Sequence, residues 1–225
     1  PAATYAQVYI RSQVATLQGN MTVTYLEIVS SFVAAGNTVT VTASASVNIA
    51  AGGYITSTSG GSWTVSGTWT NASTSASWSF AAPITFNSGA NQTMTFAGTN
   101  LAGNEFDAVT FNSTAAMTYT MATRGLRLGG ALSITDTLTT VGLTTSNLAV
   151  TAGSITIGTN GTLIAGSSTI TVSGNWTSSA GTFTVGTSTV SIQAIAAIAA
   201  ATTSSFYNLT ITTGTSTPST NIDVD

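Results

Sequence analysis

The 225-residue sequence has no cysteine, no histidine and no lysine, and its only cations are three arginines. The lack of cysteine excludes a disulfide framework and a thiolate metal site. Only 4% of the residues are charged and the formal net charge is −3, whereas about 25% are charged in ordinary soluble proteins. Without a basic patch, we expect no binding to nucleic acid or to anionic membranes.

Long apolar runs are also missing. A transmembrane helix needs about 20 consecutive apolar residues, and the longest candidate, IQAIAAIAAA at 192–201, has half that length. Intrinsic disorder is excluded as well, because disordered chains are poor in hydrophobic residues and this chain is 43% hydrophobic. Serine, threonine, glycine and alanine dominate instead. We therefore expect a β protein that hydroxyl groups keep in solution, and an extracellular or cell-surface location. Because the chain starts at Pro1 rather than Met, we also expect that an N-terminal segment has been removed.

Short segments along the chain alternate apolar residues with Thr or Ser. This period of two predicts strands, and no run of ten residues has a helical period. Clusters such as AGG, GTNG and AGSS separate the segments and predict turns. The alternating apolar pairs include Val39 and Val41, Val47 and Ile49, Leu148 and Val150, Ile155 and Ile157, Ile170 and Val172, Phe183 and Val185, and Val190 and Ile192.

Two heptapeptides are almost identical: TVSGTWT at 64–70 and TVSGNWT at 171–177. The segments around them also match, for example SVNIAAGGYI at 46–55 with SITIGTNGTLI at 154–164. Internal similarity of this kind is typical of repeat architectures. The sequence therefore predicts two related units, about 37–143 and 144–225, after an N-terminal segment at 1–36 that lies outside the repeat.

Two architectures fit this pattern. A tandem antiparallel β-sandwich would use hairpin turns, and Asn160-Gly161 is one plausible turn of that kind. A parallel β-solenoid would stack strands about 4.8 Å apart in rungs of roughly twenty residues. The solenoid also explains the excess of Thr and Ser, because outward hydroxyl side chains stack on their own kind in the next rung. We therefore predict an all-β chain that forms a parallel β-solenoid over 37–225.

The run LAVTAGSITIGTNGTLIAGSSTITVSGNWTSSAGTFTVGTSTVSI (148–192), followed by SSFYNLTI (204–211), resembles repeats of large secreted surface proteins of bacteria and archaea. These are the filamentous-haemagglutinin and autotransporter-passenger proteins. The resemblance implies a right-handed β-helix on a cell surface that acts as an adhesin, a stalk or a fibre.

Candidate reactive groups are few. Glu105 and Asp107 lie on one face if AGNEFDAV is a strand, where two carboxylates could hold a cation such as calcium or act as a glycosidase pair. Arg124 and Arg127 offer a simpler role for them, as partners in surface ion pairs worth at most about 1 kcal/mol. Polysaccharide lyases need a basic residue as well as acids, and lysine is absent. We therefore expect no enzyme activity and no cofactor.

The four tryptophans divide into two pairs. Trp69 and Trp176 occupy the same position in the two heptapeptides, which favours a structural role. Trp63 and Trp78 are the candidates for stacking on a glycan. Seven Asn-X-Ser/Thr triplets are possible N-glycosylation sites: Asn20, Asn71, Asn91, Asn112, Asn160, Asn175 and Asn208.

The segment ATYAQVYIRSQVATLQ (3–18) alternates strongly. A simple alternation puts Ala6, Val8 and Ile10 on one face and Tyr5, Gln7, Tyr9 and Arg11 on the other. The segment is either a cap on the first rung or a strand that completes the sheet of a neighbouring subunit. For the second role, the candidate assembly residues are Tyr5, Val8, Ile10 and Val14.

We therefore expect an extracellular structural subunit that polymerises head to tail with copies of itself into a filament or sheath. The alternative is a carbohydrate-binding adhesin module that uses the Trp63–Trp78 patch, with surface glycans as partners. A third possibility is a polysaccharide-active enzyme that uses Glu105 and Asp107. Neither nucleic acid nor membrane insertion is part of any of these hypotheses.

Overall fold

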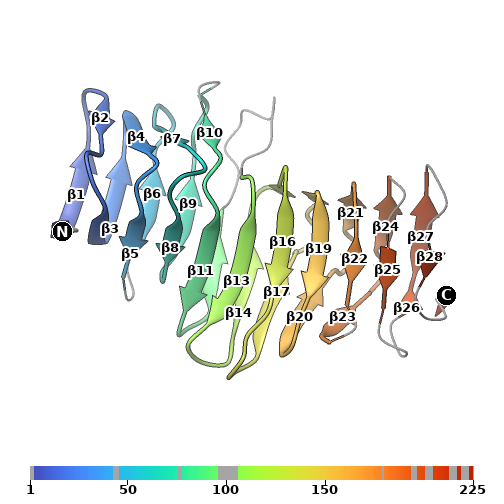
Figure 1. Cartoon of the computed structure of the whole chain (residues 1–225). Coiled ribbons are helices and arrows are strands. Elements are labelled where there is room, and N and C mark those ends of the chain that lie inside the picture. Colours follow the sequence, from blue (N-terminus) through green and yellow to red (C-terminus); the bar gives the residue numbers. More distant parts are fainter. Residues whose placement is uncertain are drawn as a thin grey trace.

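The computed structural model describes residues 3–42, 46–75, 78–95, 106–178, 180–193, 197–200, 205–212, 217–218 and 223–224. In this part of the chain every element is a strand and every strand pair is parallel. The strands stack into a β-solenoid of about nine turns (Figure 1). The predicted solenoid is confirmed and the antiparallel sandwich is wrong. None of the described residues forms a helix that could cross a membrane.

The solenoid has three walls. The first, which we call the long sheet, contains β1 (Ala3–Ile10), β3 (Met21–Ile28), β5 (Val39–Val41), β8 (Trp63–Val65), β11 (Ile84–Ser88), β13 (Val109–Ser113), β16 (Ala131–Ile134), β19 (Ser154–Ile157), β22 (Trp176–Thr177), β25 (Ala197–Ala199) and β28 (Thr217–Pro218). The long strand β3 bends, so that its first half pairs with β5 and its second half with β6. That bend begins the second wall.

The second wall, or second sheet, contains β6 (Val47–Ile49), β9 (Trp69–Asn71), β12 (Gln92–Met94), β14 (Met117–Met121), β17 (Val141–Thr144), β20 (Gly161–Ile164) and β23 (Thr182–Thr184). The third contains β2 (Ala15–Thr16), β4 (Ser31–Ala35), β7 (Tyr54–Ser57), β10 (Ser79–Phe80), β15 (Leu126–Arg127), β18 (Val150–Ala152), β21 (Thr169–Val172), β24 (Thr189–Ile192) and β27 (Asn208–Ile211). The bridge between Thr70 and Thr95 connects β9 to the strand that follows it in the second wall, β12. The bridge between Phe106 and Leu128 continues the third wall between β10 and β15. A last pair joins β26 (Ser205–Phe206) to β29 (Asp223–Val224).

Turn length varies while the strands stay in register. A turn takes 18 residues from Met21 to Val39 but 25 from Ile84 to Val109, and each of these pairs is aligned in the long sheet. The predicted rung of roughly twenty residues is confirmed. Because the stacked strands remain aligned, the added residues lie in the corners between walls.

The core follows from the period of two. Alternate residues of each strand point inward and are buried, as in the buried-intermediate-buried pattern of β5, β6 and β8. The inward-facing columns of side chains are mainly Val, Ile and Leu. An aromatic cluster around Trp69 lies in the core of the middle turns. Full burial of each such side chain contributes about 1.5–3 kcal/mol, so the stacked columns supply the stability that the chain lacks in charge pairs.

The two heptapeptides occupy different corners of the solenoid. TVSGTWT leaves β8 in the long sheet and enters β9 in the second sheet, whereas TVSGNWT leaves β21 in the third sheet and enters β22 in the long sheet. Both segments are a strand, a Ser-Gly corner and a strand that begins with Trp. The two heptapeptides therefore share the sequence of a corner, but they do not occupy equivalent positions in the three walls.

The proposed unit boundaries fall within continuous stacking. The boundary at 143/144 lies inside β17, which pairs with β14 before it and β20 after it. In segment 1–36, the described residues 3–36 form β1 to β4, which belong to the first two turns. Asn160 has a positive φ of 57°, but Gly161 begins the parallel strand β20, so Asn160-Gly161 forms a corner and no hairpin.

Asparagine side chains at the corners tie neighbouring turns together. The Oδ1 of each accepts a hydrogen bond from a backbone N–H one turn later, at 2.8–3.0 Å: Asn20 from Thr38, Asn91 from Thr118, Asn147 from Ser167, and Asn175 from Ala197. These bonds satisfy backbone donors that the corners would otherwise leave without a strand partner.

Candidate functional site

The first turn is the most distinctive surface of the solenoid. Among the described strands, β1 pairs only with β3, so no described strand pairs with its other edge. Tyr5 is aligned with Val23, which is fully buried, yet Tyr5 is 48% exposed. Val14 is 63% exposed. An exposed strand edge with apolar side chains is a template for another strand.

Two predicted assembly residues complete this surface. Val8 is aligned with Leu26 and Ile10 with Ile28, both buried core positions. Val8 is half-buried and packs on the core, and Ile10 is buried. Tyr5, Val8 and Ile10 thus lie at the end of the apolar core, and together with the exposed Val14 we call them the open turn.

The predicted faces of this strand were wrong in part. Tyr5 shares the inward side with Val8 and Ile10, although a simple alternation separates them. The register of β1 on β3 is constant but omits Ala6, and the inward side changes phase there because the strand bends at Ala6. The hydroxyl of Thr24 donates a hydrogen bond to the carbonyl of Ala6 at that corner.

The outer side of the first turn is polar and aromatic. Tyr9 packs on Tyr25 at 5.6 Å between ring centroids, and the guanidinium of Arg11 lies 4.7 Å from the Tyr9 ring. Arg11 also forms an ion pair with Glu27 at 3.2 Å. This cluster braces β1 against β3 on the outer side of the first turn.

A second uncovered ledge occurs in the middle of the solenoid, and its chemistry differs. The chain takes six residues from Trp63 to Trp69 but ten from Ile84 to Met94 in the next turn. The corner that follows β11 therefore projects beyond the turn before it, and Figure 1 shows the lower rim stepping outward there. We call this ledge the polar step.

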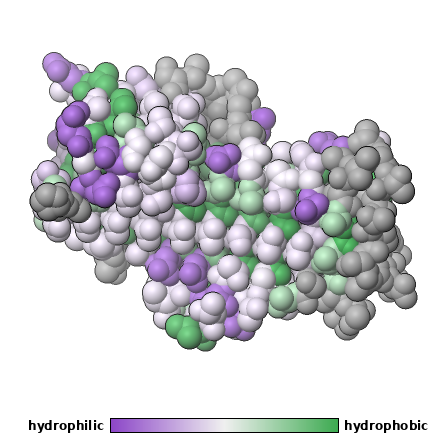
Figure 2. Space-filling model, in the orientation of Figure 1, coloured by the Kyte–Doolittle hydropathy of each residue, from purple (hydrophilic) through white to green (hydrophobic). Residues whose placement is uncertain are grey.

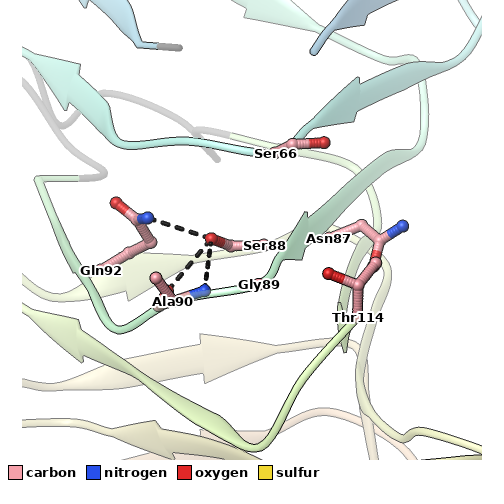
Figure 3. A pocket seen from close by; sticks show the side chains of 7 residues that line it. All are labelled: Ser66, Asn87, Ser88, Gly89, Ala90, Gln92 and Thr114. Atoms are coloured by element: carbon pink, nitrogen blue, oxygen red, sulfur yellow. Dashed lines mark hydrogen bonds between the residues drawn. The ribbon is translucent and has the colours of Figure 1, made fainter. Parts of the chain in front are cut away.

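A cavity of about 400 Å³ lies on the polar step, lined by Ser66, Asn87, Ser88, Gly89, Ala90, Gln92 and Thr114. The Ser88 hydroxyl donates to the carbonyl of Ala90 at 3.0 Å and accepts from the Gln92 amide at 3.0 Å (Figure 3). The corner thus folds back and pairs Ser88 with Ala90 and Gln92, while the buried Oδ1 of Asn87 has no hydrogen-bond partner among the described residues. No family model, curated protein or solved structure matches this chain.

The structure separates the candidate tryptophans. Trp63 is 1% exposed and its indole N–H donates to the Ser57 hydroxyl at 3.3 Å. The prediction of a glycan platform is therefore wrong for Trp63, because its ring faces are covered by the core. Trp69 and Trp176 are fully buried, and their predicted structural role is confirmed.

Trp78 remains a candidate for glycan stacking. It is half-buried, stacks on Phe80 at 6.0 Å with an interplanar angle of 18°, and lines a cavity of about 220 Å³. Asp107 is exposed and lines the same cavity, together with Phe106. The sequence did not place Trp78 and Asp107 together, because 28 residues separate them along the chain.

The predicted acidic pair is described only in part, since Glu105 lies outside the described residues. Within the described part of the chain, no group of three or more acidic or histidine side chains could hold a metal ion. Arg124 and Arg127 line a cavity of about 320 Å³. Their pairing with the acidic residues stays a prediction.

A buried carboxylate was not among the residues predicted from the sequence. Asp136 is only 3% exposed, and it lies in the corner between β16 and β17. Its carboxylate accepts hydrogen bonds from the N–H and hydroxyl of Ser113, from the N–H of Leu138, and from the N–H and hydroxyl of Thr139, at 2.6–3.2 Å. The sequence DTLT, an Asp followed by hydroxyl residues, is the signal of such a turn.

Tyr119 fills the core beneath this corner. Its hydroxyl accepts from the N–H of Ser88 at 2.7 Å and donates to the carbonyl of Asn112 at 3.0 Å, which bridges β11 and β13. Burial raises the pKa of Tyr119 above its usual value. The N–H of Ser88 opposes this increase in part, and the carboxylate of Asp136 adds to it. Tyr119 therefore stays neutral and holds the widened core together.

The pKa of Asp136 predicts loss of stability in acid. Burial alone would raise this pKa, but the hydrogen bonds from Ser113, Leu138 and Thr139 together hold it well below its usual value of 3.8. The unfolded chain therefore takes up this proton first as the pH falls, so the stabilisation is present above about pH 4 and is lost below it. We expect the urea midpoint to fall between pH 4 and pH 2.

Asp136→Asn is the matched variant. It should have a lower urea midpoint than the wild type at pH 7, because the amide presents a donor to groups that themselves donate. Its midpoint should then depend less on pH between 4 and 2. A variant with the same acid dependence as the wild type would contradict the role assigned to this carboxylate.

The possible glycosylation sites differ in access. Asn71 is 2% exposed, so the prediction of a glycan there is wrong for the folded chain. The others are exposed or half-buried and the possibility stays open at them: Asn20, Asn91, Asn112, Asn160, Asn175 and Asn208. Asn20, Asn91 and Asn175 already use Oδ1 to bridge turns.

Proposed function

We propose that this chain is an extracellular structural subunit that assembles with copies of itself through the open turn into a filament or sheath. The observation that carries the proposal is the apolar first turn, in which Tyr5 and Val14 are exposed, Val8 is half-buried and Ile10 is buried. Surfaces of this kind mark sites of association. A second copy stacked on β1 would extend the parallel sheets and cover these side chains.

The polar step provides an internal comparison. At the polar step, the projecting corner carries the polar residues Ser88 and Gln92, and the Ser88 hydroxyl bonds to Ala90 and Gln92. The open turn instead exposes Tyr5 and Val14. The same chain therefore contains one ledge with a polar cover and one with an apolar surface, which supports the view that the second is covered by another molecule.

The outer wall favours association at the ends. On the face seen in Figure 2 the surface is mostly of neutral hydropathy; hydrophilic groups gather near the N-terminal end and at the lower corner, and apolar surface shows near the N-terminal end and in a band across the middle. A net charge of −3 gives little repulsion between copies. Eight residues of β1 would offer main-chain hydrogen bonds for strand addition, and the side chains above Val23 and Leu26 would set the register.

Sedimentation velocity over a range of protein concentrations tests this proposal. The wild type should form large species as the concentration rises, whereas the double variant Tyr5→Glu/Val14→Glu should remain monomeric, because a second copy would bury its added charges. These positions are exposed, so the variant should fold. Deleting residues 1–18 is a less clean test, since it would uncover the apolar residues of the next turn.

Leu138→Glu is the matched control. Leu138 is 88% exposed, and it lies at a corner far from the open turn, so its substitution should leave assembly unchanged. Equal assembly by the wild type and the double variant would overturn the role of the open turn. A wild type that stays monomeric at every concentration would overturn self-assembly itself.

A further inference from the structure

The outer side of the long sheet carries an unbroken column of hydroxyl side chains. Each member is the register partner of the next, from one turn to the following one. With stacked strands about 4.8 Å apart, nine members extend over roughly 40 Å. The members are Thr4, Thr22, Thr40, Thr64, Thr85, Thr110, Ser133, Thr156 and Thr177.

The column stays in phase although the turns differ in length. The turn from Val39 to Trp63 has 24 residues and the turn from Trp63 to Ile84 has 21, yet a threonine follows each of these residues. All the added residues lie in corners. The long sheet thus keeps one hydroxyl column in register despite unequal turns, and Figure 1 shows its strands side by side from β11 to β25.

A second column lies beside the first. Its members follow the first column by two residues, so they share its face at a spacing of about 6.6 Å along each strand. All are neutral and half-buried: Thr42, Ser66, Asn87, Asn112 and Thr135. Together the columns form a two-dimensional array of neutral polar groups, which we call the hydroxyl array.

The chemistry of the array restricts its ligand. Each hydroxyl both donates and accepts hydrogen bonds, and the branched Cβ of threonine restricts the direction of its hydroxyl. The array has no charged group, so none of its members binds a strong hydration shell of its own. A ligand that contacts all nine turns must itself be flat, neutral, periodic and able to donate and accept at each repeat.

We propose that the hydroxyl array binds the surface of ice. Water in a crystal meets each of these conditions, and the strand spacing is close to a repeat of oxygen atoms along one axis of hexagonal ice. The array is rigid, because its backbone is fixed by two neighbouring strands at each turn, so little conformational entropy is lost on binding. A crystalline polysaccharide is a less suitable ligand, since no member of the array is aromatic.

The third sheet supplies a matched control surface. Its outer column contains Thr151, Thr171, Ser191 and Thr210, which are also register partners. This column is shorter and is preceded by Arg127. If hydroxyl columns only solvate the walls, substitutions in the two columns should have equal effects. If the hydroxyl array binds ice, only substitutions in the column of the long sheet should have an effect.

Thermal hysteresis and ice-crystal shape, measured on the purified chain in a nanolitre osmometer, test the proposal. The wild type should shape ice crystals and show hysteresis. Thr110→Tyr should reduce the hysteresis by about tenfold, because one large ring holds its neighbours away from a flat crystal and their simultaneous contacts are lost. Thr110→Val should also reduce it without changing the shape of the wall, and Thr171→Tyr should behave as the wild type.

Absence of hysteresis in the wild type would overturn the proposal, as would an equal loss in Thr110→Tyr and Thr171→Tyr. Binding to crystalline cellulose in a pull-down, with no effect on ice, would assign the array to a polysaccharide instead. The variant Tyr5→Glu/Val14→Glu should still bind ice, so the result of this test does not depend on self-assembly. Circular dichroism near 4 °C confirms that each variant is folded.

Discussion

Replacing Trp69 with alanine is expected to destabilise the folded chain by about 3–5 kcal/mol, because a buried indole leaves a cavity that the neighbours cannot fill. Trp69 lies at the centre of the aromatic cluster, where the earlier turns meet the wider turns that follow. Its ring lies within 5.5–6.4 Å, between centroids, of five others: Trp63, Trp78, Phe80, Phe86 and Phe106. The free energy of unfolding in urea measures the effect.

Phenylalanine substitutions provide the control for this prediction. The indole N–H of Trp176 donates to the Ser178 hydroxyl at 3.1 Å, whereas the N–H of Trp69 has no acceptor among the described residues. Trp176→Phe should therefore lower the free energy of unfolding by about 1 kcal/mol more than Trp69→Phe does, because about 1 kcal/mol is the net contribution of a buried hydrogen bond. A Trp69→Ala variant as stable as the wild type would contradict the central place of this ring.

Replacing Gly161 with alanine is expected to lower the free energy of unfolding by about 3 kcal/mol, which is at the upper end of the range for overpacked sites. A Cβ at Gly161 would lie 2.0 Å from the carbonyl oxygen and 2.8 Å from the carbonyl carbon of Ile134. These are backbone atoms of another strand in the stack, so the turns themselves must separate. The midpoint of thermal unfolding, followed by circular dichroism, measures the effect.

Gly19→Ala is the matched control for Gly161→Ala. Gly19 is exposed, and a Cβ there would have no atom within 4 Å. Its substitution should leave stability unchanged or raise it by about 0.4–1 kcal/mol, because alanine restricts the unfolded chain. Equal melting temperatures for the two variants would show that the corner at Gly161 is looser than this structure implies.

The architecture could be predicted because two signals agree along most of the chain. Alternation of apolar and hydroxyl residues in segments such as 39–41 and 155–157 predicts strands, and small residues between them predict corners. Few hairpin turns and a spacing of about ten residues then favour stacked parallel rungs. Each of these inferences depends on local sequence, and local sequence determines which side chains of a strand point inward.

The assignment of strands to walls could not be predicted. Turns vary from 18 residues after Met21 to 25 after Ile84, so equal sequence spacing does not mean equal position. The two heptapeptides show the consequence, since they match in sequence and lie at different corners. The same limit explains the error at Tyr5, because alternation restarts wherever a strand bends.

The candidate surfaces were predictable to different degrees. The exposed apolar residues of segment 3–18 could be found from their alternating pattern, which lies outside the repeat. The sequence could not distinguish Trp63 from Trp78, because each is followed by a hydroxyl residue and then an apolar one. Only the stacking of neighbouring turns buries Trp63 and leaves Trp78 half-buried. Asp136 was missed because a lone Asp in a turn is ordinarily exposed, and its burial results from contact with Ser113 in the turn before.

Electron microscopy of the purified chain at increasing concentration tests the central claim most directly, which is that the open turn joins copies of this solenoid end to end. The proposal predicts unbranched filaments that lengthen with concentration, and a diffraction repeat of about 4.8 Å along their axis from stacked strands. Single, unassociated particles at every concentration would contradict it.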